Sequence, residues 1–371
     1  MPTKVTSNTA NCLVVCFAFC LIIALIFSSS SCNQKQPDTT ANTANNTNSS
    51  QIKIKRFEQA LFTVDTSAGN YVPSVKALIQ QYPDIFPLFS EQIMQWGGIN
   101  DPGENYLYAL KGFISNSDVR GLYQTTQEKF PNLSQLEAEL TAAFANYQRL
   151  FPNRSIPKQV FSHISTFGPA VLTVDSAMLG INLDMFLGRN FDVYRMREVN
   201  IPEYLSRRAE PPYITPMAMQ AYLQGIFPIA PSEKDKSSLK LIDYMVYQGK
   251  ILYLLDAVLP KTPDTLKIGY TAQQLEWCQQ EEANIWTFFI DKELLFNANY
   301  HDFFKFVNEA PTTNEMPPQS PGKISAWVGW QIIKAYLKQN PNAANNLSEL
   351  MRLHNNGQQI LTESKYKPKL E

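Results

Sequence analysis

The sequence predicts an α+β fold that is mostly helical and contains one small β-sheet. Apolar residues recur at helical spacing over most of the chain, whereas alternating apolar residues are confined to 52–57 and 157–188. No internal repeat and no second linker divides the chain after residue 50. We therefore expect one folded unit over residues 51–371.

Residues 1–31 have the pattern of a signal peptide. Leu13–Phe27 is a run of fifteen apolar residues, which suits a secretory segment and is shorter than the roughly 20 needed to span a bilayer. Serines follow, and the segment ends at Cys32. This order resembles a bacterial lipoprotein signal, in which the cysteine carries acyl chains such as palmitate, although Ser29 stands where an aliphatic residue is usual. A short uncleaved anchor is the alternative. Either interpretation places the rest of the chain outside the cytoplasm, on a membrane.

Residues 32–50 predict a tether that begins at the lipid-bearing cysteine. The segment is almost entirely Asn, Thr, Ser, Gln and Ala, which offer too little apolar surface to offset the entropy of ordering. A flexible chain of this length holds a folded domain roughly 20 to 25 Å from its anchor on average.

The first part of the folded unit alternates briefly and then becomes helical. Ile52, Ile54 and Phe57 predict a short strand that leads into the next element. Helices are expected over 74–96, with breaks near Pro83 and Pro87, over 104–114, and over 133–151. The last of these helices should begin with a capping box of Ser134 and Glu137.

The second part begins with strands and ends with helices. Over 157–188 the period of two predicts two strands joined by a turn at Gly168-Pro169. Helices are then expected at about 213–227, 235–258, 271–296, 321–338 and 344–362, separated by proline-marked loops.

Charge and cysteine content narrow the range of functions. The formal net charge is −1, so no basic excess indicates nucleic acid as a partner. Of the five cysteines, only Cys32 and Cys278 lie outside the signal segment, so no internal disulfide is expected if Cys32 carries lipid. Cys278 lies on an apolar helical stripe, which is typical of a buried and unreactive thiol.

Patterns typical of catalytic sites are missing from the sequence. A zinc protease of the HExxH type needs two histidines four residues apart, and His163, His301 and His354 are each more than fifty residues from the next. GxSxG, a phosphate-binding glycine loop and GxGxxG are also absent. We therefore expect a protein that is not an enzyme and holds no metal or cofactor.

Glu282 is the polar residue that most needs an explanation. It stands in the middle of an apolar helical stripe that includes Cys278 and Ile285, and a buried carboxylate is costly unless it is paired. The favoured interpretation pairs it with Arg207 or Arg208. The alternative makes it a general base or metal ligand in a hydrolase, together with Asp184 or Glu210.

Two helices carry a glycine where a close packing partner is expected. Gly329 lies between Trp327 and Trp330 in a helix that is apolar around most of its circumference, so something should approach it closely. Gly249 has the same position in the stripe of LIDYMVYQGKILYLLD and could supply that contact. Because most of the many aromatic rings should be core, a small-molecule or peptidoglycan pocket is a third and weaker hypothesis.

The C-terminal segments resemble the gliding-motility lipoprotein GldB family of Bacteroidetes. The matching stretches are LSRRAEPPYITPMAMQAYL, MVYQGKILYLLDAVLP, TLKIGYTAQQLEWCQQEEANIWTFFIDKELL and SPGKISAWVGWQIIKAYL, and the similarity extends back through GINLDMFLGRNFDVY to IKIKRFEQALF. The residues that carry it, as structural or pocket-lining positions, are Arg207, Arg208, Glu210, Gly249, Trp277, Glu282, Trp286, Pro321, Gly322, Trp327, Gly329 and Trp330.

This resemblance implies a lipoprotein of the cell envelope that faces the periplasm and is needed by the gliding machinery and the associated type IX secretion apparatus. Its partners would be other envelope proteins and, through the lipid, a membrane. The family is also distantly similar to zinc proteases of zincin-like fold, which carry HExxH on the helix that here reads PYITPMAMQAYLQGIFP. Met217, Met219 and Ala221 offer no hard metal ligand, so the resemblance implies a scaffold kept after loss of its zinc site.

Overall fold

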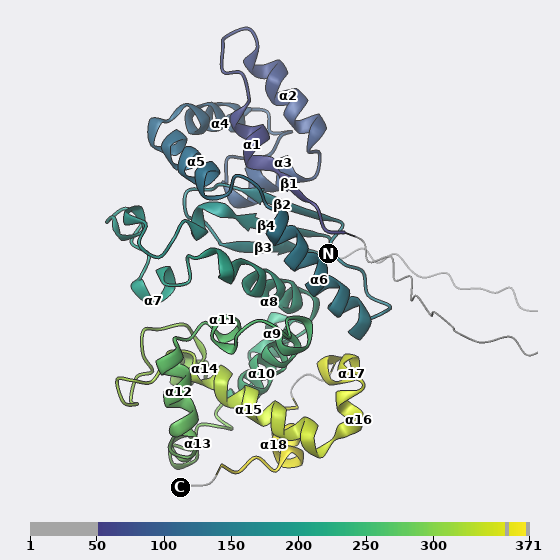
Figure 1. Ribbon diagram of the computed structural model, residues 1–371, viewed down its shortest axis with the longest axis vertical. Helices are drawn as coiled ribbons and strands as arrows, with labels where there is room; N and C mark the ends of the chain where they lie inside the picture. The colour runs from purple at the N-terminus through teal and green to yellow at the C-terminus, as the bar shows by residue number, and fades with distance from the viewer. Residues whose placement is uncertain (1–50, 353–355, 369–371) are drawn as a thin grey trace, which may run out of the picture. The chain divides into compact units, whose positions relative to one another are not determined.

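A four-stranded mixed sheet is built from the segments with alternating apolar residues. In this computed structural model, which describes residues 51–352 and 356–368, the strands are β1 (Ile54–Arg56), β2 (Gln159–His163), β3 (Val171–Val174) and β4 (Met178–Asn182). Their order is β1-β2-β4-β3. β1, β2 and β4 are parallel to one another, and β3 is antiparallel to β4 at the edge (Figure 1).

The predicted break at Gly168-Pro169 is present between β2 and β3, but these two strands are not neighbours in the sheet. Two strands were expected there and the structure has three, because the hairpin is at Asp175 and Ser176, between β3 and β4. Residues 164–170 instead carry the chain from β2 past the place of β4 to the far edge of the sheet. The reason is burial: Val160, Phe161 and Ser162 of β2 are almost fully covered, so β2 must have a neighbouring strand on each side.

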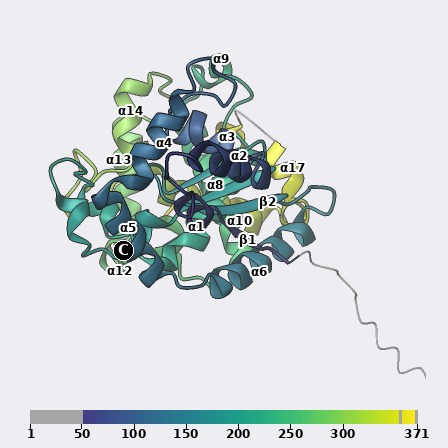
Figure 2. The ribbon, with the colours of Figure 1, turned by 90° about the horizontal axis from the view of Figure 1, so that it is seen from above.

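Between β1 and β2 the chain forms a group of helices. They are α1 (Phe57–Phe62), α2 (Tyr71–Gln81), α3 (Ile85–Leu88), a π-helical turn η1 (Phe89–Ile93), α4 (Asn105–Ser115), α5 (Ser117–Lys129) and α6 (Ser134–Leu150). The break before α3 follows the prediction for Pro83, whereas Pro87 lies inside α3. α5 was not expected, and α6 runs beside β1 when the sheet is viewed from above (Figure 2).

The predicted capping box at the start of α6 is wrong. Ser134 is the first helical residue, and its N–H donates to Asn132 Oδ1 at 3.2 Å. Glu137 instead accepts a hydrogen bond from the Ile54 N–H at 2.9 Å and pairs with Lys53 Nζ at 2.9 Å. The carboxylate therefore links α6 to the edge of β1.

Short turns connect the sheet to the long helices. They comprise η2 (Leu183–Phe186), η3 (Asp192–Arg195), α7 (Glu203–Ser206) and η4 (Pro211–Tyr213), which leads into α8 (Ile214–Ile226). α8 packs against β3 and β4 on one side and against α6 and α10 on others.

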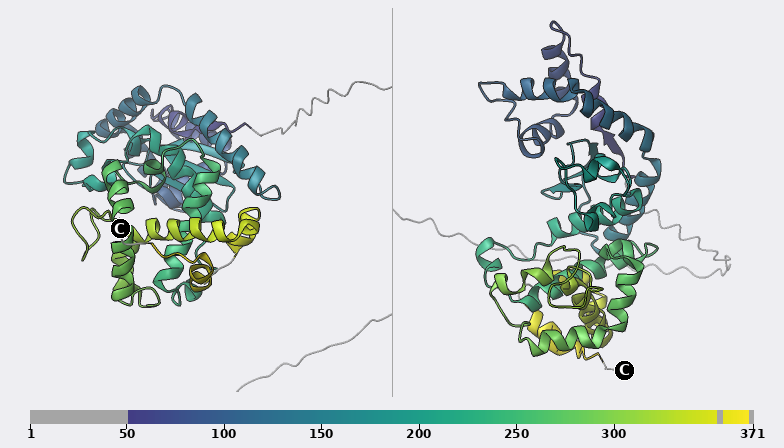
Figure 3. Two further views of the ribbon diagram at one scale, coloured as in Figure 1. Left: turned by 60° about the horizontal axis from the view of Figure 1, so that its bottom comes forward. Right: turned by 90° about the vertical axis from the view of Figure 1, so that its left-hand side faces the viewer.

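The remaining chain is helical. Its elements are α9 (Glu233–Lys236), α10 (Leu241–Val258), α11 (Asp264–Ile268), α12 (Ala272–Gln280), α13 (Glu282–Asp291), α14 (Tyr300–Val307), α15 (Ile324–Gln339), α16 (Pro341–Ala344), α17 (Leu347–Arg352) and α18 (Gly357–Ser364). The helices expected over 235–258, 271–296 and 344–362 are each interrupted. Figure 3 shows these helices at the opposite end from α2 and α4.

α10 and α15 cross in close contact, and the crossing occurs at the two predicted glycines. A Cβ on Gly249 would lie 2.2 Å from the Gly329 carbonyl oxygen, and one on Gly329 would lie 1.7 Å from the Met245 carbonyl oxygen. The prediction of a close neighbour at both glycines is confirmed. Trp327 and Trp330, on the same helix as Gly329, are almost fully buried in the core.

The α+β, mostly helical fold class with a small sheet is confirmed. The described residues fall within one contact unit. None of the helices in the described part of the chain is both long and apolar enough to cross a bilayer. The expected signal peptide (1–31) and the tether with its lipid-bearing Cys32 (32–50) lie outside the described residues.

Candidate binding cleft

A large cavity among the described residues lies over one face of α6. It has a volume of about 990 Å³ and is bounded by the 129–133 loop, α6 as far as Asn146, the 211–216 segment and the 258–266 segment. Cavities of several hundred to a thousand cubic ångströms are the usual size of binding pockets. Size alone therefore makes this cleft the first candidate for a binding site.

Apolar side chains and proline rings form the walls of the cleft. The prolines come from all three flanking segments, and the larger apolar residues lie between them: Pro131, Pro211, Pro212, Pro216, Pro260 and Pro263, with Phe130, Leu133, Leu136, Ile214, Val258, Leu259 and Leu266. Proline fixes its own φ, so these segments have little backbone freedom to lose when a ligand binds. The cleft is consequently preformed.

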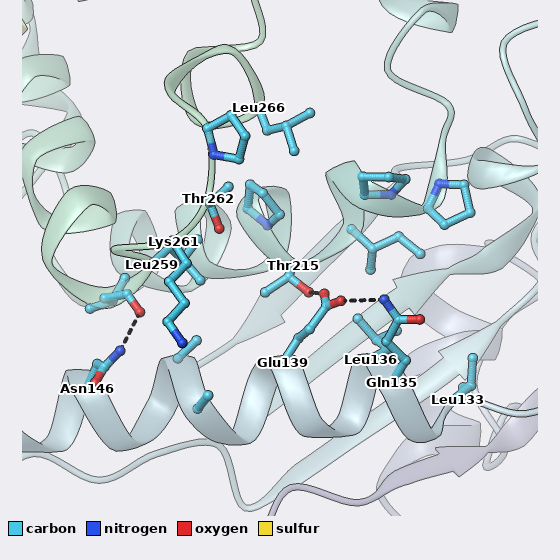
Figure 4. Close-up of a pocket in the computed structure, with 18 of the residues that line it drawn as sticks. Leu133, Gln135, Leu136, Glu139, Asn146, Thr215, Leu259, Lys261, Thr262 and Leu266 are labelled. Atoms are coloured by element: carbon cyan, nitrogen blue, oxygen red, sulfur yellow. Dashed lines mark hydrogen bonds between the residues drawn. The ribbon is translucent and has the colours of Figure 1, made fainter.

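One carboxylate is held in position on the floor of the cleft (Figure 4). Glu139 accepts a hydrogen bond from Thr215 Oγ1 at 2.6 Å and another from Gln135 Nε2 at 3.0 Å. Thr215 belongs to α8, so the pair also joins α6 to α8. The carboxylate keeps acceptor capacity for a donor on a ligand, since each of its oxygens has two lone pairs.

A second polar contact fixes the other end of the cleft. Asn146 Nδ2 donates to the Val258 carbonyl oxygen at 2.9 Å and ties α6 to the end of α10, where the 259–263 loop begins. In Figure 4 the Lys261 side chain reaches down from that loop toward α6. Lys129 and Lys261 are both exposed members of the lining, so the margins of the cleft carry positive charge.

None of the site residues expected from the sequence lines this cleft. Arg207 and Arg208 follow α7 and bind loops of the helical region. Arg207 donates to the Gly269 carbonyl oxygen at 2.7 Å and to Gln274 Oε1 at 2.9 Å. Arg208 forms two contacts with the Glu309 carboxylate, at 2.8 Å and 3.1 Å.

Glu309 is the centre of an ion-pair network that the sequence analysis missed. Its carboxylate also accepts from Lys323 Nζ at 2.6 Å. Burial raises the pKa of Glu309, but Lys323 and Arg208 outweigh that effect and lower the pKa to about 2. Gly322 lies beside this network, with its Cα against the backbone of Ala310. The arginines and Gly322 therefore hold loops together.

The expected pairing of Glu282 with Arg207 or Arg208 is wrong. The helix is interrupted at Glu281, so Glu282 is the first residue of α13 and only partly buried. Its Oε1 accepts a hydrogen bond from the Tyr366 hydroxyl at 2.8 Å. The ring of Tyr366 also packs edge-on against Trp286, with centroids 5.1 Å apart. Glu282 and Trp286 thus bind the segment that follows α18.

The carboxylates proposed for the alternative metal site have separate partners. Asp184 accepts backbone N–H groups of Ser165 and Phe167, at 2.9 Å and 3.3 Å, and Glu210 accepts from the Arg189 backbone N–H at 3.0 Å. Among the described residues no group of three or more His, Cys, Asp or Glu could hold a metal ion. Met217 and Ala221 of α8 are partly exposed, and Met219 is buried.

The remaining predicted residues divide between core and surface. Trp330 Nε1 donates to Asp256 Oδ2 at 2.9 Å, and Trp327 is buried without a role at a cavity. Trp277 lines a shallow pocket of about 520 Å³ together with Thr271, Gln273, Gln274, Glu276, Gln280, Pro318 and Gln319. Cys278 is fully buried, and burial raises the pKa of its thiol. The prediction of a buried Cys278 is confirmed.

A polar cluster at the ends of the parallel strands was also missed. His163 closes β2 and is fully buried, and neither ring nitrogen has a hydrogen-bond partner in the described part of the chain. Burial lowers the pKa of His163 to about 3 and raises that of Asp184 to about 7. The sequence could have predicted this cluster, because polar residues interrupt the apolar pattern where each of these strands ends.

Comparison with known proteins gives one match. No curated protein and no solved structure matches the chain. A family model described as gliding motility protein GldB matches residues 35–368, which is nearly the whole chain. The chain therefore belongs to the GldB family of gliding motility lipoproteins.

Proposed function

We propose that this protein is a non-catalytic lipoprotein of the cell envelope that serves the gliding and type IX secretion machinery by binding partner proteins. Membership of the GldB family supports the role in motility. The apolar segment that ends at Cys32 supports a lipid anchor and a folded domain facing the periplasm. The distant zincin-like resemblance implies a zinc site on α8, and we propose that this site has been lost.

The cleft over α6 is the observation that carries the proposal. It follows α6 from Leu133 to Asn146, which is about 20 Å at 1.5 Å per residue. Its apolar lining and proline walls suit the side chains of an extended polypeptide segment, about six residues long at 3.3 Å each. Glu139 would receive a donor from that segment, and Lys129 and Lys261 favour acidic residues at its ends.

A pair of substitutions on α6 tests this role. Ala142 is exposed and lines the cleft, whereas Ala138 is exposed on the same helix outside the lining. Ala142→Arg fills the cleft with a long cation and is expected to reduce gliding and adhesin secretion to the level of a deletion strain. Ala138→Arg adds the same charge one turn away and should leave both within twofold of wild type. Time-lapse microscopy of single cells measures gliding, and immunoblots of secreted adhesin measure secretion.

Three results would count against the proposal. Normal gliding in the deletion strain removes the motility role, and normal gliding with a stable Ala142→Arg protein removes the cleft. Zinc at one ion per chain in purified protein, measured by elemental analysis, contradicts the non-catalytic role and favours a metal-dependent hydrolase.

A further inference from the structure

The two edges of the sheet differ in how their backbone groups are covered. At the β1 edge, the Ile52 N–H donates to Thr141 Oγ1 at 3.0 Å and the Ile54 N–H donates to Glu137 Oε1 at 2.9 Å. Both acceptors belong to α6, which lies alongside β1 (Figure 2). This edge is closed to any further strand, in the way that natural sheets usually protect their edges.

At the β3 edge the outward backbone groups have no hydrogen-bond partner among the described residues. The Asn182 N–H donates to the Ala170 carbonyl oxygen, and the register pairs Leu172 with Gly180 and Val174 with Met178. Hydrogen-bonded pairs alternate along an antiparallel ladder, so Val171 and Thr173 turn their N–H and C=O groups away from β4. No other described segment forms a hydrogen bond with these groups. All four β3 residues are partly exposed.

β3 also lacks the protection that exposed edge strands usually have. Its sequence, Val-Leu-Thr-Val, contains no charge and no proline, although Pro169 and Asp175 flank it. The strand is firmly placed. Leu172 and Phe161 pack over Gly180, and the Thr173 hydroxyl is 3.0 Å from where a Cβ on Gly225 of α8 would lie. An uncharged edge strand with unpaired donors and acceptors is a template for strand addition.

We propose that the outer edge of β3 binds an extended segment of a partner polypeptide, which adds to the sheet as a fifth strand beside α8 (Figure 1). Only an extended backbone presents donors and acceptors in pairs at two-residue spacing, so the open groups of Val171 and Thr173 specify this class of ligand. The inference rests on the proposed function as a partner-binding protein. It concerns a surface separate from the α6 cleft, so the two can fail independently.

Two substitutions of Thr173 separate backbone binding from side-chain binding. Thr173→Pro removes the outward N–H without removing a hydrogen bond to β4. Thr173→Val keeps the backbone and the branched shape. A photoreactive residue replaces the exposed Pro169 in the full lipidated protein, and living cells are irradiated. We expect a covalent adduct with another polypeptide. Thr173→Val should retain the adduct, and Thr173→Pro should reduce it at least tenfold.

Several outcomes would overturn the inference. An adduct that persists in a folded Thr173→Pro protein, or that is lost equally in Thr173→Val, shows that the backbone edge is not the ligand site. An adduct with twice the mass of the chain shows pairing of two copies instead. Hydrogen exchange of the unsubstituted protein needs no variant: the Val171 and Thr173 amides should exchange at least tenfold more slowly in native membranes than in purified protein, and equal rates contradict the proposal.

Discussion

At the scale of single residues, His163 and Asp184 affect stability in opposite directions as pH changes. His163 has a folded-state pKa of about 3, against 6.5 in the unfolded chain, so between these values the unfolded chain binds the extra proton and stability falls as pH falls. Asp184 has a folded-state pKa of about 7, against 3.8, so the native protein binds the extra proton and stability falls as pH rises. From about pH 4 to 6.5 the two slopes cancel.

Removing either group should reveal the pH dependence of stability that the other group causes. In Asp184→Asn, which keeps an oxygen for the Ser165 N–H, the free energy of unfolding should rise with pH more steeply than in wild type by about 1.4 kcal/mol per pH unit between pH 4 and 6.5. In His163→Leu the change should have the same size and the opposite sign. Urea denaturation at a series of pH values measures both. Parallel pH profiles for all three proteins would show that neither group titrates in this range.

At the scale of secondary-structure elements, the contact between α10 and α15 depends on Gly249 and Gly329 having no side chain. Gly249→Ala places a methyl group 2.2 Å from the Gly329 carbonyl oxygen, so the helices must separate or distort. We expect a loss of at least about 2 kcal/mol in the free energy of unfolding, the range seen for overpacked cores.

A matched control exists for that substitution. Gly112 is exposed in the middle of α4, and nothing lies within 4 Å of a Cβ added there. Gly112→Ala should therefore stabilise the protein by about 0.5–1 kcal/mol through helix propensity alone. Chemical denaturation of the two variants compares them directly. Equal stabilities for Gly249→Ala and wild type would mean that the two backbones are not in contact in solution.

The elements also show how far sequence reasoning reaches. The glycine contact was predictable because a glycine costs helix propensity and must have a compensating cause. The strand order was not, because Gly168-Pro169 marks a loop without saying which strands pair across it. Glu282 was misplaced because periodicity continued through the interruption at Glu281. The α6 cleft was missed because its walls come from three loops that are distant in the sequence.

At the scale of the whole molecule, anchoring and folding are expected to be separable. The described residues, which begin at Gln51, form one contact unit. Cys32→Ser should therefore leave the thermal unfolding midpoint of the domain unchanged, while the protein moves from the membrane fraction to the soluble fraction and gliding is lost. Fractionation and mass spectrometry of the N-terminus check this. An unmodified thiol on the native protein would contradict lipid attachment.

The attachment of β1 to its neighbours has a mechanical consequence. The chain enters the domain at Gln51, and the next residues are bonded on one side to α6 and on the other to β2. A pull applied at residue 51 along β1 acts parallel to the strand, so several hydrogen bonds carry the load together instead of opening one after another. The point where force would reach this domain from an anchor is thus arranged to resist shear.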